Sequence, residues 1–120
     1  MLHLKSLVSI TGLVALFSAG CGGGAMPLDK LTDAKSTVRA AQEAGAQSTP
    51  QAALHLKMAN DELASAQSAI NDKNADQAQL LLNQAQADAD LSLALARGAA
   101  DTQAAQEAQA KIQALSKQAQ

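Results

Sequence analysis

The residue best suited to covalent chemistry is Cys21, the only cysteine of the chain. A thiolate is a strong nucleophile, and a single cysteine has no partner within its own chain for a disulfide. Cys21 directly follows two small residues, Ala19 and Gly20, at the end of an apolar run. Small side chains let a peptidase approach the backbone closely, which is typical of the end of a signal segment.

The segment before Cys21 predicts a secretory signal peptide over residues 1–20. Lys5 and the amino terminus give it a positive start, and an uncharged, mostly apolar stretch runs from Leu7 to Ala19. This stretch is too short to span a bilayer comfortably, since a spanning helix needs about 20 apolar residues. We therefore expect residues 1–20 to be removed.

Residues 18–21 resemble the bacterial lipobox, with Ser18 at the position where leucine is usual. The resemblance implies cleavage between Gly20 and Cys21, a thioether-linked diacylglycerol on the thiol, and an N-acyl lipid. One acyl chain binds a membrane only marginally, at about 0.8 kcal/mol per buried methylene, whereas two or three give a durable anchor. Gly22, not aspartate, follows the cysteine, which by the same resemblance favours the outer membrane and a protein facing the periplasm. The alternative is a free thiol after an ordinary signal peptide.

The remaining ionisable and hydroxyl side chains form no recognisable catalytic or metal-binding set. His55 has no Cys, Asp or Glu at ligand spacing, so we expect a solvent-facing or rim histidine. Carboxylates one or two positions apart do not share a helix face, so Asp61-Glu62 and the pair Asp88 and Asp90 are predicted to be solvated surface. The serines lack a histidine base at a plausible position. We therefore predict that the protein is not an enzyme and has no cofactor besides the covalent lipid.

Composition narrows the range of partners. Lys and Arg number 9 against 11 Asp and Glu, for a net charge of −2, and no basic patch is present, which argues against nucleic acid. The only aromatic residue, Phe17, falls in the signal segment, so the remaining chain offers neither base stacking nor an aromatic ligand cage. The length leaves room for one small domain.

Apolar residues recur at three- and four-residue spacing after the signal segment. This pattern predicts an all-α fold, a three-helix antiparallel bundle with a long, protruding C-terminal helix. Gly45 is a natural helix stop, and Thr49-Pro50 is a strong helix start. The expected elements are a lipidated terminus and tether at 21–27, helices at 28–44, 50–71 and 75–117, and a polar turn at 71–74.

Alanine alternates with leucine or isoleucine on one face of the second helix, which lets antiparallel helices approach closely. The first helix repeats part of this pattern, which predicts a tetratricopeptide-like helix pair. Leucines of the third helix point to more than one side and are expected to be buried against two neighbours, and Met58 to fill a gap. The second-helix seam is Ala52, Leu56, Ala59, Leu63, Ala66 and Ile70, and the leucines are Leu80, Leu81, Leu82, Leu91, Leu93 and Leu95.

A second apolar seam follows Gly98, where mid-helix glycine weakens the helix by about 1 kcal/mol. The same phase extends back through Gly98 and Ala94 to Leu91, with Asp101 as its one charged interruption. We divide the helical part there, into a domain at 28–97 and an extension at 98–120. A helix of this length is marginal in water by itself, so the seam needs a partner, either a second copy or another envelope protein. The alternative is a frayed, solvated end. The expected partner-binding residues are Ala105, Ala108, Ile112 and Leu115.

The helical part resembles a family of short bacterial envelope lipoproteins built on an alanine-rich helical domain of unknown function. Relatives can carry an OmpA-like peptidoglycan-binding domain; none follows here, so we do not expect direct peptidoglycan binding. The end of the chain is also similar to coiled-coil murein lipoproteins, although those end in a wall-linked lysine. The matching features, within 28–97, are the alanine-rich first helix, the break at 45–50, and the runs at 63–66, 74–78 and 84–90.

These expectations combine into one main hypothesis and one alternative. The main hypothesis is a non-catalytic structural or protein-interaction lipoprotein, anchored in the outer membrane, whose working surface is the long third helix. The alternative is a small periplasmic carrier that holds an apolar ligand or an unfolded segment in a groove between helices. Leu91, Leu93 and Leu95 would line that groove.

Overall fold

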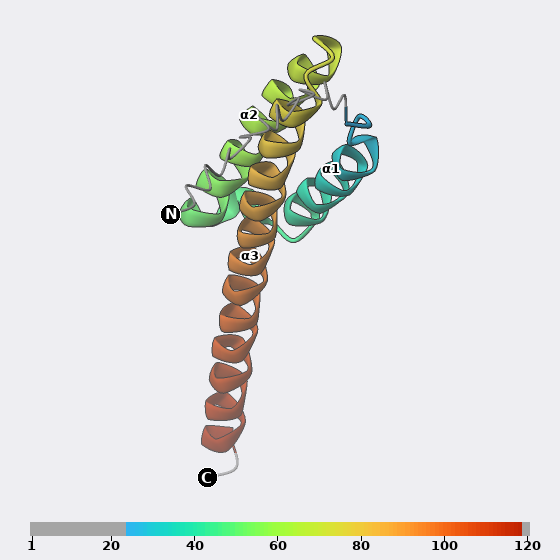
Figure 1. Ribbon diagram of the computed structural model, residues 1–120. Helices are drawn as coiled ribbons and strands as arrows, with labels where there is room; N and C mark the ends of the chain where they lie inside the picture. Colours follow the sequence, from blue (N-terminus) through green and yellow to red (C-terminus); the bar gives the residue numbers. More distant parts are fainter. Residues whose placement is uncertain (1–23, 119–120) are drawn as a thin grey trace, which may run out of the picture.

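The computed structural model of the chain describes residues 24–118, shown in Figure 1. The predicted signal peptide and the predicted cleavage and lipidation site at Gly20 and Cys21 lie outside these residues. The described part is all-helical, as predicted, and none of its helices is long and apolar enough to cross a bilayer. In chain order the elements are α1 (Leu28–Glu43), the short 3-10 turn η1 (Ala46–Ser48), α2 (Pro50–Asn71) and α3 (Ala75–Gln118).

Local signals set the helix ends. Gly45 ends α1 in a left-handed conformation (φ 82°), which costs glycine little because it has no Cβ. Pro50 is the first residue of α2, and the carbonyl of the extended Thr49 accepts the Ala53 N–H at 2.8 Å, although the Thr49 side chain makes no capping bond. At the start of α3 the Asn74 side-chain oxygen accepts the Gln77 N–H at 3.1 Å.

The three helices are not equivalent, because α3 is the common partner of the other two. In Figure 1, α1 and α2 flank the first half of α3, and both make most of their contacts with α3. Contacts between α1 and α2 are the fewest of the three pairs. The predicted pairing of the first two helices is therefore the weakest packing in the bundle.

The core consists largely of alanine. The α2 seam is buried as predicted except for Ile70, which is partly buried against the core. Small buried side chains let the helices approach closely, but each contributes little apolar area. The residues that α3 contributes to the buried face are Ala78, Leu82, Ala85, Ala89, Ser92 and Ala96.

The prediction that all the α3 leucines would be buried against two neighbours was wrong for two of them. Leu80 and Leu91 are 53% and 43% exposed, because they lie on the side of α3 away from the buried face. Leu82 is buried, and Leu81, Leu93 and Leu95 are partly buried against the core. Met58 fills no gap either, since it lies on the outer side of α2 and is 40% exposed.

Beyond the bundle, α3 continues as a single helix that protrudes from it (Figure 1). Its 44 residues span about 66 Å at 1.5 Å per residue. Gly98 does not interrupt it, and the Thr102 hydroxyl donates to the Gly98 carbonyl at 2.8 Å. Residues 100–115 are all exposed, because α1 and α2 are too short to cover this part.

Candidate functional site

An exposed stripe of mostly apolar residues runs along nearly the whole of α3. Its positions recur at alternating three- and four-residue spacing, and every one of them is exposed. Gln84 and Asp101 are its two polar interruptions. We call it the α3 stripe, and it consists of Leu80, Gln84, Ala87, Leu91, Ala94, Gly98, Asp101, Ala105, Ala108, Ile112 and Leu115.

The α3 stripe and the buried face of α3 lie on roughly opposite sides of the helix. Each residue advances an α-helix by about 100°, so positions 91, 94 and 98 point away from positions 89, 92 and 96. Packing of α1 and α2 therefore uses one side of α3 and leaves the other uncovered among the described residues. The predicted partner-binding residues at the C-terminal end continue the same three- and four-residue spacing, in the part of α3 where every residue from 100 to 115 is exposed.

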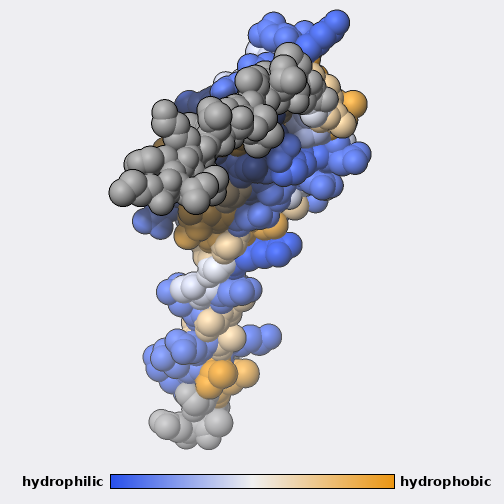
Figure 2. Space-filling view, in the orientation of Figure 1, coloured by the Kyte–Doolittle hydropathy of each residue, from blue (hydrophilic) through white to orange (hydrophobic). Residues whose placement is uncertain are grey.

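The large apolar side chains of the α3 stripe that are most exposed lie near its end. Ile112 is 66% exposed and Leu115 is 57% exposed. Figure 2 shows hydrophobic side chains gathered in this region of the protruding helix, between hydrophilic neighbours. Exposed apolar patches rimmed by polar residues commonly mark interaction surfaces.

Charge is unevenly distributed along the protruding part of α3. The acidic residues Asp101 and Glu107 come first, and the basic residues Lys111 and Lys117 follow. Glu107 accepts a hydrogen bond from the Gln103 amide at 3.0 Å on the same helix, off the α3 stripe. Asp101 is the one charged member of the stripe itself, so it limits how another helix can pack there.

A second cluster joins α2 to α3 inside the bundle. His55 Nδ1 and Asp88 Oδ1 lie 2.7 Å apart, and their side chains are 25% and 16% exposed. His55 is thus at the rim of the core, within the range predicted, but the prediction that Asp88 would be solvated surface was wrong. The two residues are 33 positions apart along the chain, and only the packing of α2 on α3 brings them together.

Glu62 is the third member of this cluster. Burial raises the pKa of its carboxyl group above the ordinary value, and the neighbouring Asp88 raises it further, with a smaller contribution from Asp61. Its Oε2 atom is buried without a hydrogen-bond partner. The prediction that Glu62 would be solvated surface was therefore wrong. Asp61 and Asp90 are exposed, as predicted.

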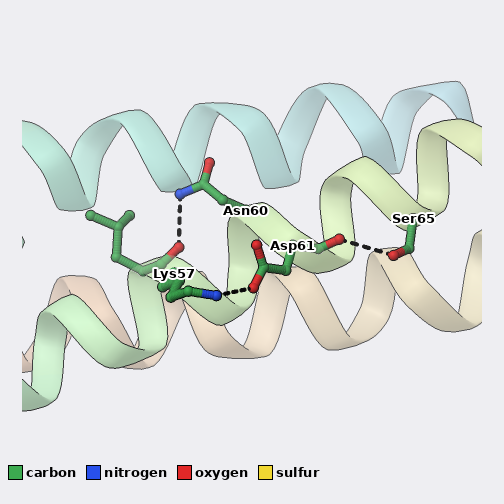
Figure 3. Close-up of polar contacts among 5 residues, drawn as sticks. Lys57, Asn60, Asp61 and Ser65 are labelled. Carbon is green, nitrogen blue, oxygen red and sulfur yellow. Dashed lines mark hydrogen bonds and ion pairs between the residues drawn. The ribbon is translucent and has the colours of Figure 1, made fainter.

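The other polar side chains near this cluster make contacts within the bundle or along α2. The buried Ser92 hydroxyl donates to the Ala52 carbonyl at 2.8 Å, so its proton is already engaged. Within residues 24–118, no three His, Cys, Asp or Glu side chains are placed to hold a metal ion. On the outer side of α2, Lys57 pairs with Asp61, and the Ser65 hydroxyl donates to the Asp61 carbonyl at 3.0 Å (Figure 3). Within the cluster, the contact of His55 with Asp88 connects α2 to α3.

The hollow between α1 and α3 is polar. Its volume is about 460 Å³, and Lys30 Nζ donates to Asn83 Oδ1 across it at 2.7 Å. The Gln86 amide donates to the Thr37 hydroxyl at 2.9 Å, also from α3 to α1. The leucines proposed to line a carrier groove are elsewhere and not together, since Leu91 is exposed while Leu93 and Leu95 pack against the core.

A family model matches residues 29–110, more than half of the chain. The chain belongs to the DUF4398 family, a domain of unknown function. The matched region extends past Gly98, so it includes part of the protruding helix as well as the bundle. No curated protein and no solved structure matches the chain.

Proposed function

We propose that this DUF4398 protein is a non-catalytic, lipid-anchored protein of the bacterial envelope whose α3 stripe binds a protein partner. The observation that carries the proposal is the stripe itself, which is exposed from Leu80 to Leu115 on the side of α3 that the bundle leaves uncovered. Removing apolar surface from water contributes about 25 cal/mol per Å², so a matching partner surface is favoured there.

The anchor is proposed from the sequence at 18–21, and the described residues are compatible with its placement. Gly24 and Met26 line the same hollow as residues 72–76 of the α2–α3 turn. The chain therefore enters the bundle at the end where α3 begins, and the free end of α3 points away from it (Figure 1). An anchor on Cys21 would hold the protruding helix away from the bilayer and toward the periplasm.

The anchor is tested by Cys21→Ser. The control is Ser18→Ala, a similarly small substitution in the same segment that keeps the Cys21 thiol. We expect the unaltered chain in the membrane fraction, with an acylated N-terminal Cys21 by mass spectrometry, and the same for Ser18→Ala. Cys21→Ser should lack the lipid and leave the outer-membrane fraction. A mature chain that starts at another residue, unmodified, would exclude the anchor.

The binding surface is tested by Ile112→Glu, with Gln106→Glu as the control. Both residues are exposed on the protruding helix, but only Ile112 belongs to the α3 stripe. After chemical crosslinking of intact envelopes, the complex should be lost with Ile112→Glu and kept with Gln106→Glu. If both variants crosslink like the unaltered chain, the stripe is not a binding surface.

A further inference from the structure

We propose that the occupant of the α3 stripe beyond the bundle is a second copy of this chain, packed antiparallel. In this arrangement Ala105 of each copy lies opposite Ala108 of the other, with a two-fold axis between them. The inference rests on the proposed function, because it names the partner of the same surface. Its argument comes from the order of small, large and charged residues along the stripe.

The first step is the fit of side-chain sizes. In this register Gly98 faces Leu115 of the second copy, and two alanines meet at the centre. Small residues at the middle of the contact let two helices approach closely, as buried alanines do between α2 and α3. The large Leu115 side chain then has space opposite Gly98, which has no side chain. In the monomer, the space that a Cβ atom on Gly98 would occupy is open.

The second step is the position of Asp101, the only charged residue of the stripe. A parallel, in-register pair would set two Asp101 carboxylates against each other, which is unfavourable in a helix interface. The antiparallel pair sets Asp101 opposite Ile112 of the second copy, next to Lys111 of that copy. Because the pair is two-fold symmetric, this Asp–Lys contact occurs twice in the dimer. Charges at the edges of a helix–helix interface help to determine the orientation of the two helices.

The third step concerns register and closure. Sliding the antiparallel pair by one heptad toward the C-terminus brings Lys111 of one copy against Lys111 of the other. In a staggered parallel pair, stripe residues at both ends remain uncovered and can bind further copies, which generates an open filament. In the antiparallel pair the two stripes cover each other, so the assembly ends at two copies. Residues 100–115 are exposed on all sides, so the bundle of one copy does not obstruct the helix of the other.

The charge arrangement is tested on the full-length chain in detergent, by the dimer dissociation constant from analytical ultracentrifugation. Asp101→Lys and Lys111→Asp should each weaken the dimer by about tenfold, because each change replaces two attractive contacts with repulsive ones. The double variant Asp101→Lys/Lys111→Asp should return within about threefold of the unaltered chain. Glu107→Lys is the control, since it makes the same charge change off the stripe and should have little effect.

The orientation is tested by disulfide crosslinking, with the unaltered chain, whose only cysteine is Cys21, as the background. A mixture of Ala105→Cys and Ala108→Cys chains should crosslink to each other. Ile112→Cys alone should not, because antiparallel packing separates the two copies of position 112 by about 16 Å along the helix. A disulfide between two copies of Ile112→Cys would show parallel packing and overturn the inference.

The outcomes for this inference and for the proposed function are distinct. A chain that stays monomeric at every concentration, or a dimer that Lys111→Asp leaves unchanged, overturns the antiparallel second copy. If Ile112→Glu still abolishes crosslinking to another envelope protein, the proposed function stands without the inference. Circular dichroism of each variant, expected to match the unaltered chain, shows that the bundle is still folded.

Discussion

The two halves of α3 belong to one helix and are both rich in alanine, but they have different surroundings. In the bundle half (residues 75–97), one side of the helix is buried by α1 and α2, and the opposite side carries the α3 stripe. In the protruding half (residues 98–118), the helix has the same stripe and no covering helix among the described residues. The same residue types therefore form a core in one half and a surface in the other.

Alanine shows the difference most directly. Ala85 and Ala89 are completely buried, whereas Ala105 and Ala108 are exposed on the same helix. Neither residue type nor helix propensity separates the two pairs; their position along α3 does, because α1 and α2 cover residues 85 and 89 but end before residues 105 and 108. A helix that protrudes from a folded bundle also avoids the cost of nucleation, so it persists where an isolated peptide would be marginal.

The largest contrast between the halves is expected for leucine. Leu82→Ala should reduce the free energy of unfolding by about 2–5 kcal/mol, because Leu82 is fully buried and its loss leaves a cavity. Leu115→Ala should cost the monomer less than about 0.5 kcal/mol, because its side chain is exposed. Urea unfolding followed by circular dichroism measures both. Equal losses would mean that the protruding half is part of the cooperative core.

A smaller effect is expected from the contact between His55 and Asp88, compared with the exposed pair of Lys57 and Asp61. His55→Ala should cost about 1–2 kcal/mol, since it leaves Asp88 partly buried without its partner and close to Glu62. Lys57→Ala should cost at most about 0.5 kcal/mol, because both charges of its pair are solvated. A loss with His55→Ala no larger than with Lys57→Ala would show that the cluster does not fasten α2 to α3.

Substitution by alanine should change stability in opposite directions at Gly45, which ends α1, and at Gly98, which lies within α3. Gly45→Ala should destabilise the bundle by about 1 kcal/mol, because its φ of 82° is strained for a residue with a Cβ. Gly98→Ala should raise the stability of the protruding helix by up to about 1 kcal/mol, since its added Cβ contacts nothing. Thermal unfolding and the helical signal at 222 nm test the pair, and a gain with Gly45→Ala would contradict the left-handed cap.

The least disruptive change concerns Glu62, whose pKa is raised above 4.5 in the folded chain. The folded state then binds the proton of the Glu62 carboxyl group more tightly than the unfolded state does. Protonated Glu62 therefore makes its full contribution to the free energy of unfolding below pH 4.5. This contribution is lost as pH rises through the raised pKa. The charged groups that act on Glu62 are Asp88 from α3 and Asp61 from α2.

Glu62→Gln should remove this pH dependence and leave stability at pH 7 equal or higher. Urea unfolding between pH 4 and pH 7 measures the difference from the unaltered chain. Asp90→Asn is the matched control, since it neutralises an exposed carboxylate on the neighbouring helix. If Glu62→Gln is clearly less stable at pH 7 while Asp90→Asn is not, the charged form of Glu62 must be stabilised by the fold, contrary to its raised pKa.

The sequence by itself determined the elements of this protein. Gly45, Thr49-Pro50 and Asn74 act within a few residues of the backbone, so the ends of α1 and α2 and the start of α3 could be predicted from them. The seam after Gly98 was also predictable, because heptad spacing is a property of one helix. The same phase could be followed back through Gly98 and Ala94 to Leu91 in the sequence. Only its further continuation to Leu80 was missed, because Leu80 was assigned to the core.

Tertiary structure alone decided which side of α3 is covered. A leucine-rich helix offers several apolar sides, and only the placement of α1 and α2 buries Leu82 and exposes Leu80 and Leu91. The contact of His55 with Asp88 and the raised pKa of Glu62 have the same origin, since no local signal links residues on different helices. Short-range backbone preferences determine where a helix begins and ends, whereas burial and charge depend on what packs against it.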